Sequence, residues 1–390
     1  MAMKIMILEW KSFGNEDITE AFREIGHEVV SHPFTDNGQK SDEELRQELK
    51  RAIQANSPDL LFSFNYFPAA AFVCKELALP YAAWIYDSPY VRLYHYTINY
   101  PTNHVFTFDK EQYTEFHNAG IQTVHYLPMA ANTKRLSAMR DFKRFRGTPW
   151  YNRHPVAFVG SLYTEKHQFY QRMDKITPYT RGYLEGLMAA QKQVYGYNFI
   201  QESLPESIIR DMQGSLPLQP AGDSVESVEY LFAQYVINRQ LTAIERQEML
   251  SAVAERFSLD LYTPEQGTRL KGCTNHGPVD YYDYAPYVFK QAKINLNITL
   301  RSILSGIPLR AFDIMGAGGF LLSNYQADFL DDFVPGEDMV FYENQADLLD
   351  KIAYYLDHEK ERADIAQNGF HKVAARHTYV HRAEEILASL

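Results

Sequence analysis

An arginine and an aspartate stand three residues apart at the start of an expected short helix. The segment is GIPLRAFDIMGAGGFLLSN (306–324), and Arg310 and Asp313 share one face of that helix. Phe312 and Met315 lie on the opposite face, toward a core. The amino end of a helix suits a phosphate, and a carboxylate one turn later can accept hydrogen bonds from both hydroxyls of a ribose. This pattern predicts a nucleotide site, while an ion pair that only stabilises the helix is an equally supported alternative.

The loop before this helix, LRSILSGIPL (300–309), adds Arg301 and Gly306. In the nucleotide interpretation Asp313 binds the ribose. Arg301, Arg310 and backbone N–H groups then meet the diphosphate, because guanidinium and amide groups are its usual donors.

Three glycines follow the acid: Gly316, Gly318 and Gly319. A glycine inside a regular element costs about 1 kcal/mol relative to alanine. We therefore expect another group to approach the backbone closely here.

Short apolar runs alternate with amphipathic segments along most of the chain. MKIMILEW (3–10), PDLLFSFN (58–65) and their successors have strand length, with helical patterns between them. This alternation is typical of α/β folds with parallel sheets. We predict two Rossmann-like domains that face a cleft, because ligands of such sheets bind at the carboxyl ends of the strands.

The predicted domains are separated by KRFRGTPWYNRHP (143–155), whose glycine and prolines indicate a linker. The predicted amino-terminal domain covers residues 1–145, and the carboxy-terminal domain covers 153–370. The second contains a helical insertion over about 163–256, and a last helix covers 371–390.

Composition and charge exclude several classes of protein. The 390 residues carry a formal net charge of −11, which argues against nucleic acid as the main partner. No apolar run reaches the 18 residues of a membrane span, and the first strand ends too early for a signal peptide, so we expect a cytoplasmic protein. The two cysteines lack metal-ligand spacing, and LEWKSFGNED (8–17) lacks the glycines of a dinucleotide fingerprint.

The chain resembles glycosyltransferases with two Rossmann-like domains, known as the GT-B architecture. More narrowly, it resembles the group related to the spore-maturation protein CgeB. The similarity covers residues 60–357 and is most specific over the long stretch that contains Arg310 and Asp313. The matching stretches are FSFNYFP, WIYDSPY, FVGSLY, KINLNITLRSILSGIPLRAFDIMGAGGFLLSNY and GEDMVFYENQADLLDKIAYYL.

This resemblance implies three contacts with a nucleotide-sugar donor. Asp313 would bind the ribose, a Gly-x-Val segment followed by a tyrosine would bind the base, and the loop after the first strand of the second domain would approach the diphosphate. The residues of the last two contacts are Gly277, Val279, Tyr281 or Tyr282, Gly160 and Ser161.

One position departs from the family pattern. Retaining members commonly carry a glutamate eight residues before the ribose acid, whereas this chain has Ser305. The stereochemical course is therefore left open. The chain lacks the Asp-x-Asp spacing by which metal-dependent glycosyltransferases hold a divalent ion. We therefore expect arginine, lysine and the helix end to balance the charge of the phosphates. Lys166 is a further candidate, although a solvated lysine is the simpler interpretation.

The resemblance assigns the acceptor and any base to the first domain. Asp87 ends the apolar run AAWIYD (82–87), where it could remove the proton of an acceptor hydroxyl. The alternative is a turn, since Asp-Ser-Pro is common where an aspartate accepts from local N–H groups. Asn65 and Asp109 end neighbouring expected strands, and we expect both to be structural.

The sequence thus predicts a metal-independent transferase that moves a sugar from a nucleotide-diphosphate donor to a hydroxyl acceptor. Uridine is the commonest donor base in similar enzymes. Because the glutamate is missing at position 305, a non-catalytic nucleotide-sugar-binding scaffold is the alternative function. Nucleotide binding without donor turnover would distinguish it.

Overall fold

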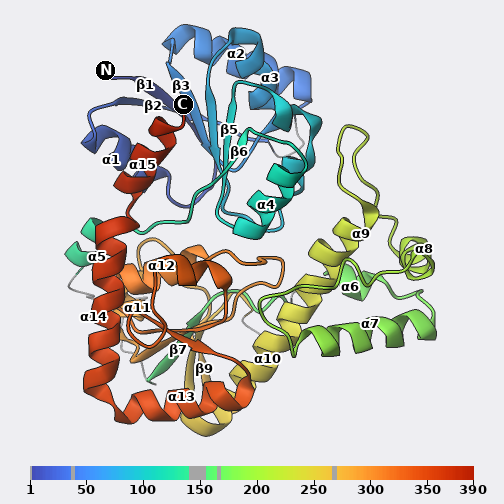
Figure 1. The fold of residues 1–390 in the computed structure, drawn as a ribbon, viewed down its shortest axis with the longest axis vertical. Helices are drawn as coiled ribbons and strands as arrows, with labels where there is room; N and C mark the ends of the chain where they lie inside the picture. The colour runs from blue at the N-terminus through green and yellow to red at the C-terminus, as the bar shows by residue number, and fades with distance from the viewer. Residues whose placement is uncertain (1, 37–39, 140–154, 165–167, 266–269) are drawn as a thin grey trace. The chain divides into compact units, whose positions relative to one another are not determined.

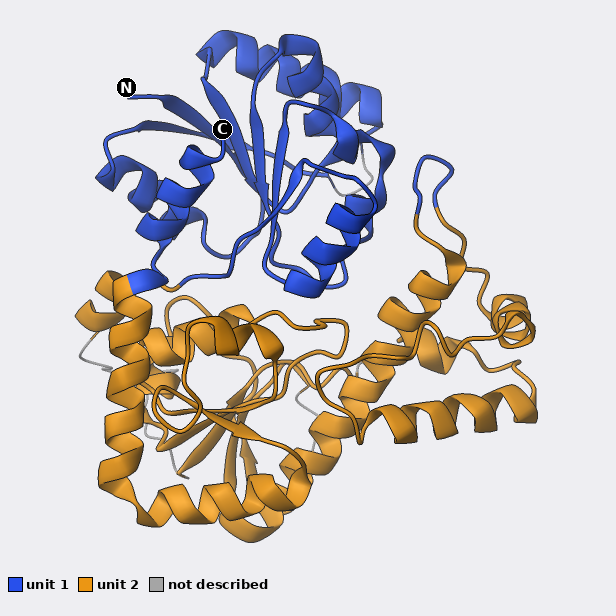
Figure 2. Cartoon of the chain, viewed as in Figure 1, with its two compact units in different colours: residues 1–130, 221–225, 376–390 blue, residues 131–220, 226–375 orange. Residues whose placement is uncertain are grey.

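The computed structural model describes most of the chain, and its described residues form two compact units (Figures 1 and 2). The described residues are 2–36, 40–139, 155–164, 168–265 and 270–390. Unit 1 consists of residues 1–130, 221–225 and 376–390, and unit 2 of residues 131–220 and 226–375. Among the described residues, no helix has the length and apolar character needed to cross a membrane.

Unit 1 is a parallel six-stranded sheet in the order β2-β1-β3-β4-β5-β6. Its strands form where the sequence has apolar runs; β3, for example, is buried along its whole length. The elements are β1 (Lys4–Glu9), α1 (Asn15–Glu24), β2 (Glu28–Pro33), α2 (Asp42–Asn56), β3 (Leu60–Phe64), α3 (Pro68–Leu77), β4 (Tyr81–Trp84), η1 (Val91–Tyr94), η2 (Tyr96–Asn99), β5 (Asn103–Thr107), α4 (Lys110–Asn118), β6 (Val124–Tyr126) and α15 (Tyr379–Ala388).

The last helix of the chain belongs to unit 1. Helix α15 packs beside α1, and the Tyr379 ring meets the Trp84 ring edge-on at a centroid distance of 5.8 Å. Gly14, at the start of α1, leaves room for this packing, since a Cβ there would lie 2.9 Å from the Tyr379 hydroxyl. Arg382 of α15 donates to the Pro128 carbonyl at 2.8 Å, which fixes the carboxy-terminal segment to the loop after β6.

Unit 2 contains a second parallel sheet, in the order β12-β11-β10-β7-β8-β9. With unit 1, this confirms the predicted α/β class with two Rossmann-like sheets. The elements are α5 (Thr133–Ala138), β7 (Val156–Val159), α6 (Phe169–Arg172), α7 (Pro178–Gln191), α8 (Glu206–Ser215), α9 (Val228–Leu231), the π-helical η3 (Phe232–Ile237), α10 (Asn238–Phe257), β8 (Leu259–Tyr262), β9 (Cys273–Asn275), α11 (Ala285–Gln291), β10 (Ile294–Asn297), α12 (Leu309–Gly316), β11 (Leu321–Asn324), η4 (Ala327–Asp331), β12 (Val340–Tyr342), α13 (Gln345–Asp357) and α14 (Glu359–Arg376).

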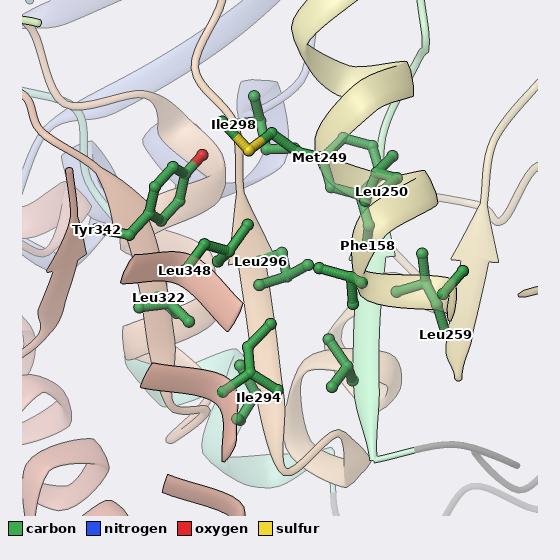
Figure 3. Packing of buried hydrophobic residues seen from close by; sticks show 14 of the residues in the cluster. Phe158, Met249, Leu250, Leu259, Ile294, Leu296, Ile298, Leu322, Tyr342 and Leu348 are labelled. Atoms are coloured by element: carbon green, nitrogen blue, oxygen red, sulfur yellow. The ribbon is translucent and has the colours of Figure 1, made fainter. Parts of the chain in front are cut away.

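The long helix α10 joins two hydrophobic cores of unit 2. Leu241, near its start, belongs to the core of the insertion helices, whereas Leu250 and Val253 pack on the sheet. Figure 3 shows the sheet core, in which side chains of five strands meet those of α10 and α13. The labelled residues are Phe158, Met249, Leu250, Leu259, Ile294, Leu296, Ile298, Leu322, Tyr342 and Leu348. The insertion is thus anchored to the sheet by one continuous helix.

In each sheet the strand order reverses between two neighbouring strands. In unit 2 the chain runs from β7 outward to β8 and β9, then returns to β10 and continues to β11 and β12 on the other side. In unit 1 the corresponding neighbours are β1 and β3. Connections leave such neighbouring strands in opposite directions, which opens a crevice at their carboxyl ends, where ligands of open α/β sheets bind. A ligand site in unit 2 is therefore expected at the loops after β7 and β10.

Candidate functional site

Helix α12 carries the acid expected at the ribose, and that acid contacts the expected tyrosine. Asp313 is buried to 8% exposure, and the Tyr281 hydroxyl donates to its Oδ2 at 2.8 Å. Among the described residues no ion pair joins Arg310 to Asp313, so the helix-stabilising pair that we considered from the sequence is not formed. A buried carboxylate held by a phenol keeps a defined orientation, as recognition of sugar hydroxyls requires.

The predicted base-binding segment follows β9. Gly277 has a φ of 77°, a conformation that favours glycine, and its N–H donates to Asn275 Oδ1 at 2.9 Å. Val279 is half-buried. Tyr281, two residues later, connects this segment to Asp313 through the hydrogen bond described above. The structure therefore brings the Gly-x-Val segment and Asp313 into one part of unit 2.

A histidine–aspartate pair beside this segment was missed from the sequence. The His276 Nε2 atom lies 2.7 Å from Oδ1 of the fully buried Asp260, and the His276 ring stacks on Tyr262 with a centroid distance of 4.7 Å. An aspartate inside the apolar strand β8 was the available signal, because a buried charge needs a partner.

The loop after β7 binds the carboxylate of another residue of the chain, Glu265. Ser161 Oγ donates to Glu265 Oε1 at 2.6 Å, and the backbone N–H groups of Leu162 and Tyr163 donate to the same oxygen at 3.1 Å. Burial raises the pKa of Glu265, but hydrogen bonds from Ser161, Thr263 and the Leu162 N–H outweigh it and hold the pKa below its ordinary value. Glu265 was not among the residues predicted from the sequence, because its partners lie about a hundred residues earlier.

Arg310 reaches the same loop from the start of α12. A Cβ on Gly160, whose φ is 156°, would lie 2.7 Å from the Arg310 Nη2 atom. Arg310 Nη1 donates to Asn297 Oδ1 at 3.2 Å, and its guanidinium lies over the Phe158 ring at 5.5 Å. Its buried Nε–H has no hydrogen-bond partner among the described residues. Gly160 thus gives a guanidinium access to the loop that we expected to approach a diphosphate.

A second guanidinium, that of Arg246, joins the loops after β7 and β10, where the strand order of unit 2 reverses. It donates to the Ser161 carbonyl after β7 and, through Nε at 3.1 Å, to the Ile298 carbonyl after β10. Burial lowers the pKa of Arg246 to about 10, so the group stays protonated at neutral pH. No carboxylate among the described residues forms an ion pair with it.

Arg246 could have been found from helical spacing. It stands three or four residues from Ala243, Met249 and Leu250, all of which are buried on one face of α10. An arginine on the apolar face of a helix must find hydrogen-bond acceptors in the interior, which distinguishes it from a solvated arginine.

Arg301 and Gly306 take part in internal contacts. Arg301 Nε donates to Glu245 Oε2 at 2.7 Å and Nη1 donates to the Val194 carbonyl at 2.8 Å. Burial opposes the charge of Arg301, but Glu245 raises its pKa above the ordinary value. The buried Gly306 accepts a hydrogen bond from Gln326 through its carbonyl. The donors of Arg301 are therefore directed at Glu245 and Val194, whereas Arg246 and Arg310 contact the loop after β7.

The close approach expected at the three glycines is made by the chain itself. A Cβ on Gly316 would lie 2.6 Å from the Ala131 Cβ, and one on Gly319 would lie 2.5 Å from the Phe289 carbonyl oxygen. Gly318 has a φ of 80° and open space around it, so it serves the turn after α12. Gly316 and Gly319 thus allow α12 and the segment after it to pack closely on their neighbours.

In unit 1, Asp87 follows β4 and contacts Asn65, which follows β3. Asn65 Nδ2 donates to Asp87 Oδ2 at 2.6 Å, while Asn65 Oδ1 accepts from the backbone N–H of Tyr86. Asp87 as a whole residue is exposed, but protein atoms surround much of its carboxyl group. This burial raises the pKa of Asp87, and the hydrogen bond from Asn65 lowers it in part. Asn65 is the one hydrogen-bond partner of this carboxylate among the described residues.

The remaining candidates have structural contacts or lie outside the described residues. Asp109 caps α4 by accepting from the N–H groups of Glu111 and Gln112. Lys166 and most of the predicted linker lie outside the residues that the structure describes. In the described part of the chain, no three His, Cys, Asp or Glu side chains are grouped to hold a metal.

Comparisons with known proteins concern the fold and the family. Residues 239–388 match the family model described as glycosyl transferase-like. A comparison with curated proteins gave no match.

Three solved structures are similar to the chain over almost its whole length. Anabaena HepE in complex with UDP-glucose has a TM-score of 0.53, with 14% identity over 100% of both chains. A glycosyltransferase of Rickettsia africae has a TM-score of 0.52, with 10% identity over 99% of both chains. Sucrose-phosphate synthase of Thermosynechococcus elongatus has a TM-score of 0.50, with 12% identity over 99% of this chain and 98% of that one. The chain therefore has the GT-B fold, and the part that matches the glycosyl transferase-like family model includes Arg246, Arg310 and Asp313.

Proposed function

We propose that the protein is a metal-independent glycosyltransferase, related to the CgeB-like group, that moves a sugar from a nucleotide-diphosphate donor to a hydroxyl acceptor. The observation that carries the proposal is the pair of guanidiniums, Arg246 and Arg310, at the point where strand order reverses in the sheet of unit 2. Both lie beside a loop whose N–H groups hold an anion. Such a site suits a diphosphate.

The proposal assigns roles to Asp313, Arg310, Arg246 and the segment from Gly277 to Val279, all of unit 2. Asp313, oriented by Tyr281, accepts hydrogen bonds from the ribose hydroxyls. Arg310 contacts the diphosphate and stabilises the negative charge that develops on the leaving group. Arg246 holds the loops after β7 and β10 together through their carbonyl oxygens and adds positive charge to the site. The segment from Gly277 to Val279 receives the donor base, and the UDP-glucose in the HepE structure favours uridine.

Unit 1 would supply the acceptor side. Asp87 removes the proton of the acceptor hydroxyl as the bond to the anomeric carbon forms. A raised pKa suits this task, because it makes the carboxylate a stronger base toward the acceptor hydroxyl. Ser305 is buried at the position where related retaining enzymes have a glutamate. Because that glutamate is missing, a non-catalytic scaffold is the second candidate function.

The proposal is tested with a panel of nucleotides and nucleotide sugars. A ligand at 100 times its Kd stabilises the folded protein by about 2.7 kcal/mol, which a thermal-unfolding experiment detects. Donor hydrolysis and transfer are then measured with each ligand that stabilises. We expect a uridine diphosphate sugar to stabilise and to be turned over.

Two arginine variants provide the matched comparison. Arg310→Ala removes the guanidinium beside Gly160, and we expect nucleotide affinity to fall about 100-fold, since hydrogen bonds to charged groups contribute about 1.5–3 kcal/mol each. Arg210→Ala removes an exposed arginine of α8 and should leave affinity unchanged. Stabilisation without turnover would favour the scaffold, and the absence of any nucleotide binding would refute both functions.

A further inference from the structure

The carboxylate of Glu265 is bound in the way that a phosphoryl oxygen is bound by a backbone loop. Three donors converge on Oε1: the Ser161 hydroxyl at 2.6 Å and the N–H groups of Leu162 and Tyr163 at 3.1 Å each. The Thr263 hydroxyl donates to the other oxygen. Successive backbone N–H groups directed at one point form the kind of concavity that binds anions.

The backbone conformation of this loop serves that convergence. Tyr163 has a φ of 56°, a region that an aromatic residue rarely adopts. In this conformation its N–H also lies 3.0 Å from Ser161 Oγ, so the hydroxyl and the amide are directed at the same carboxylate. The bound carboxylate offsets the cost of this conformation, because it satisfies donors that would otherwise lack a partner.

Two guanidiniums that contact this loop, those of Arg246 and Arg310, are not paired with the Glu265 carboxylate. Arg246 donates to carbonyl oxygens, one of them that of Ser161, and Arg310 donates to the amide oxygen of Asn297. In the described part of the chain, neither guanidinium lies within ion-pair distance of a carboxylate. The loop therefore binds one internal anion through neutral donors, beside two cations that a larger anion could reach as well.

We infer that Glu265 is an internal competitor, which occupies the anion position of the loop after β7 until the phosphate of a ligand displaces it. The inference rests on the proposed function in so far as that ligand is the donor diphosphate. A diphosphate carries more charge than a carboxylate and can contact Arg310 in addition to the loop amides, so it gains the position despite the competition. Glu265 then sets the affinity for the donor and favours release of the nucleotide product by returning to the loop.

The test measures the binding of inorganic pyrophosphate by calorimetry to the full-length protein. Glu265→Gln keeps the shape and an acceptor oxygen for the three donors but removes the charge that holds the side chain in place. We expect this variant to bind pyrophosphate about tenfold more tightly than the wild type, which corresponds to about 1.4 kcal/mol. Glu206→Gln, an exposed glutamate of α8, makes the same change in net charge and should leave the affinity unchanged.

A second pair of variants asks whether pyrophosphate uses the donors that Glu265 occupies. Ser161→Ala removes one of them, and in the Glu265→Gln background it should cancel at least part of the tenfold gain. In a double-mutant cycle the two changes should be non-additive, as expected for groups that share a partner. Circular dichroism and thermal unfolding verify that each variant is folded.

Three results would overturn the inference. These are unchanged or weaker binding by folded Glu265→Gln, a gain that Ser161→Ala leaves intact, and a lack of pyrophosphate binding by all variants. Tighter pyrophosphate binding without any sugar transfer would support the inference and refute the proposed function. Sugar transfer with equal pyrophosphate affinity in wild type and Glu265→Gln would refute the inference alone.

Discussion

Both sheets are parallel and six-stranded, but they differ in strand order and in the side chains found where that order reverses. In unit 1 this point lies between β1 and β3, where Trp10 donates to the Phe64 carbonyl at 2.8 Å and stacks on Tyr86. Asn65 follows β3 and holds the carboxylate of Asp87. In unit 2 the same point carries Arg246 and Arg310 beside backbone N–H groups.

A cation is also present in unit 1, but it is paired. Arg92 of η1 forms an ion pair with Asp36, whereas Arg246 and Arg310 have no carboxylate partner among the described residues. A parallel α/β sheet can thus present an acceptor-rich edge or a donor-rich edge, depending on a few residues after its strands. Unit 2 is suited to an anion and unit 1 to a group that gives up a proton.

Asp87→Asn gives the largest expected effect on this comparison. The substitution keeps the shape and the contact with Asn65 but removes the base, which contributes typically 100- to 10,000-fold to a rate. We expect turnover to fall by that factor while nucleotide affinity, which the proposed function assigns to unit 2, changes by less than twofold. Steady-state kinetics and nucleotide titration measure the two quantities.

Asp109→Asn is the matched control in unit 1. Asp109 also follows a strand, but it caps α4, a task that asparagine performs equally well. Turnover should therefore persist in this variant. Full activity in Asp87→Asn would make Asp87 a turn residue and would remove the functional contrast between the two edges.

Arg301→Met separates a structural arginine of unit 2 from those at the anion site. Removing Arg301 leaves Glu245, which is 1% exposed, without its charge partner, and breaking a buried pair in this way costs about 3–5 kcal/mol of folding free energy. Urea unfolding measures this loss. Nucleotide affinity of the folded variant should equal that of the wild type.

A paired substitution distinguishes the ion pair from its surroundings. In Arg301→Met with Glu245→Leu, the uncompensated charge is gone, and most of the lost stability should return. If Arg301→Met instead weakened nucleotide binding strongly without loss of stability, Arg301 would belong to the donor site, as expected from the sequence.

Local patterns allowed much of the fold and part of the site to be predicted. The strands follow apolar runs, and the shared placement of Arg310 and Asp313 on α12 follows from a spacing of three residues within one helix. The pairing of Arg301 with Glu245, in contrast, joins residues 56 positions apart. Glu265 reaches Ser161 across 104 positions. Such contacts depend on how two loops meet at the end of a sheet, which spacing along the chain does not encode.

The short strand β9 illustrates a second kind of limit. Its three residues, Cys273–Asn275, are half-buried at the edge of the sheet and lack the apolar run that identified the other strands. Its pairing with β8 depends on hydrogen bonds to a neighbour and not on a hydrophobic pattern of its own. An edge strand of this kind becomes visible only with its partner in place.

Asn65→Gly gives the smallest expected effect, on the pH dependence of unit 1. Asn65 has a φ of 58°, which glycine adopts without strain, so the substitution keeps the backbone conformation at this position while it removes the hydrogen bonds of the side chain to Asp87 and the Tyr86 N–H. The Asn65 amide lowers the pKa of Asp87 by donating to the charged carboxylate. Without it that pKa rises further, and because the base must be deprotonated, the acid limb of the kcat/KM profile should move to higher pH. Ser57→Gly, at another left-handed position of unit 1, should leave the profile in place. A limb that stays or moves to lower pH in Asn65→Gly would mean that Asn65 does not tune the base, and the acceptor-rich edge of unit 1 would then be a structural feature of the turn.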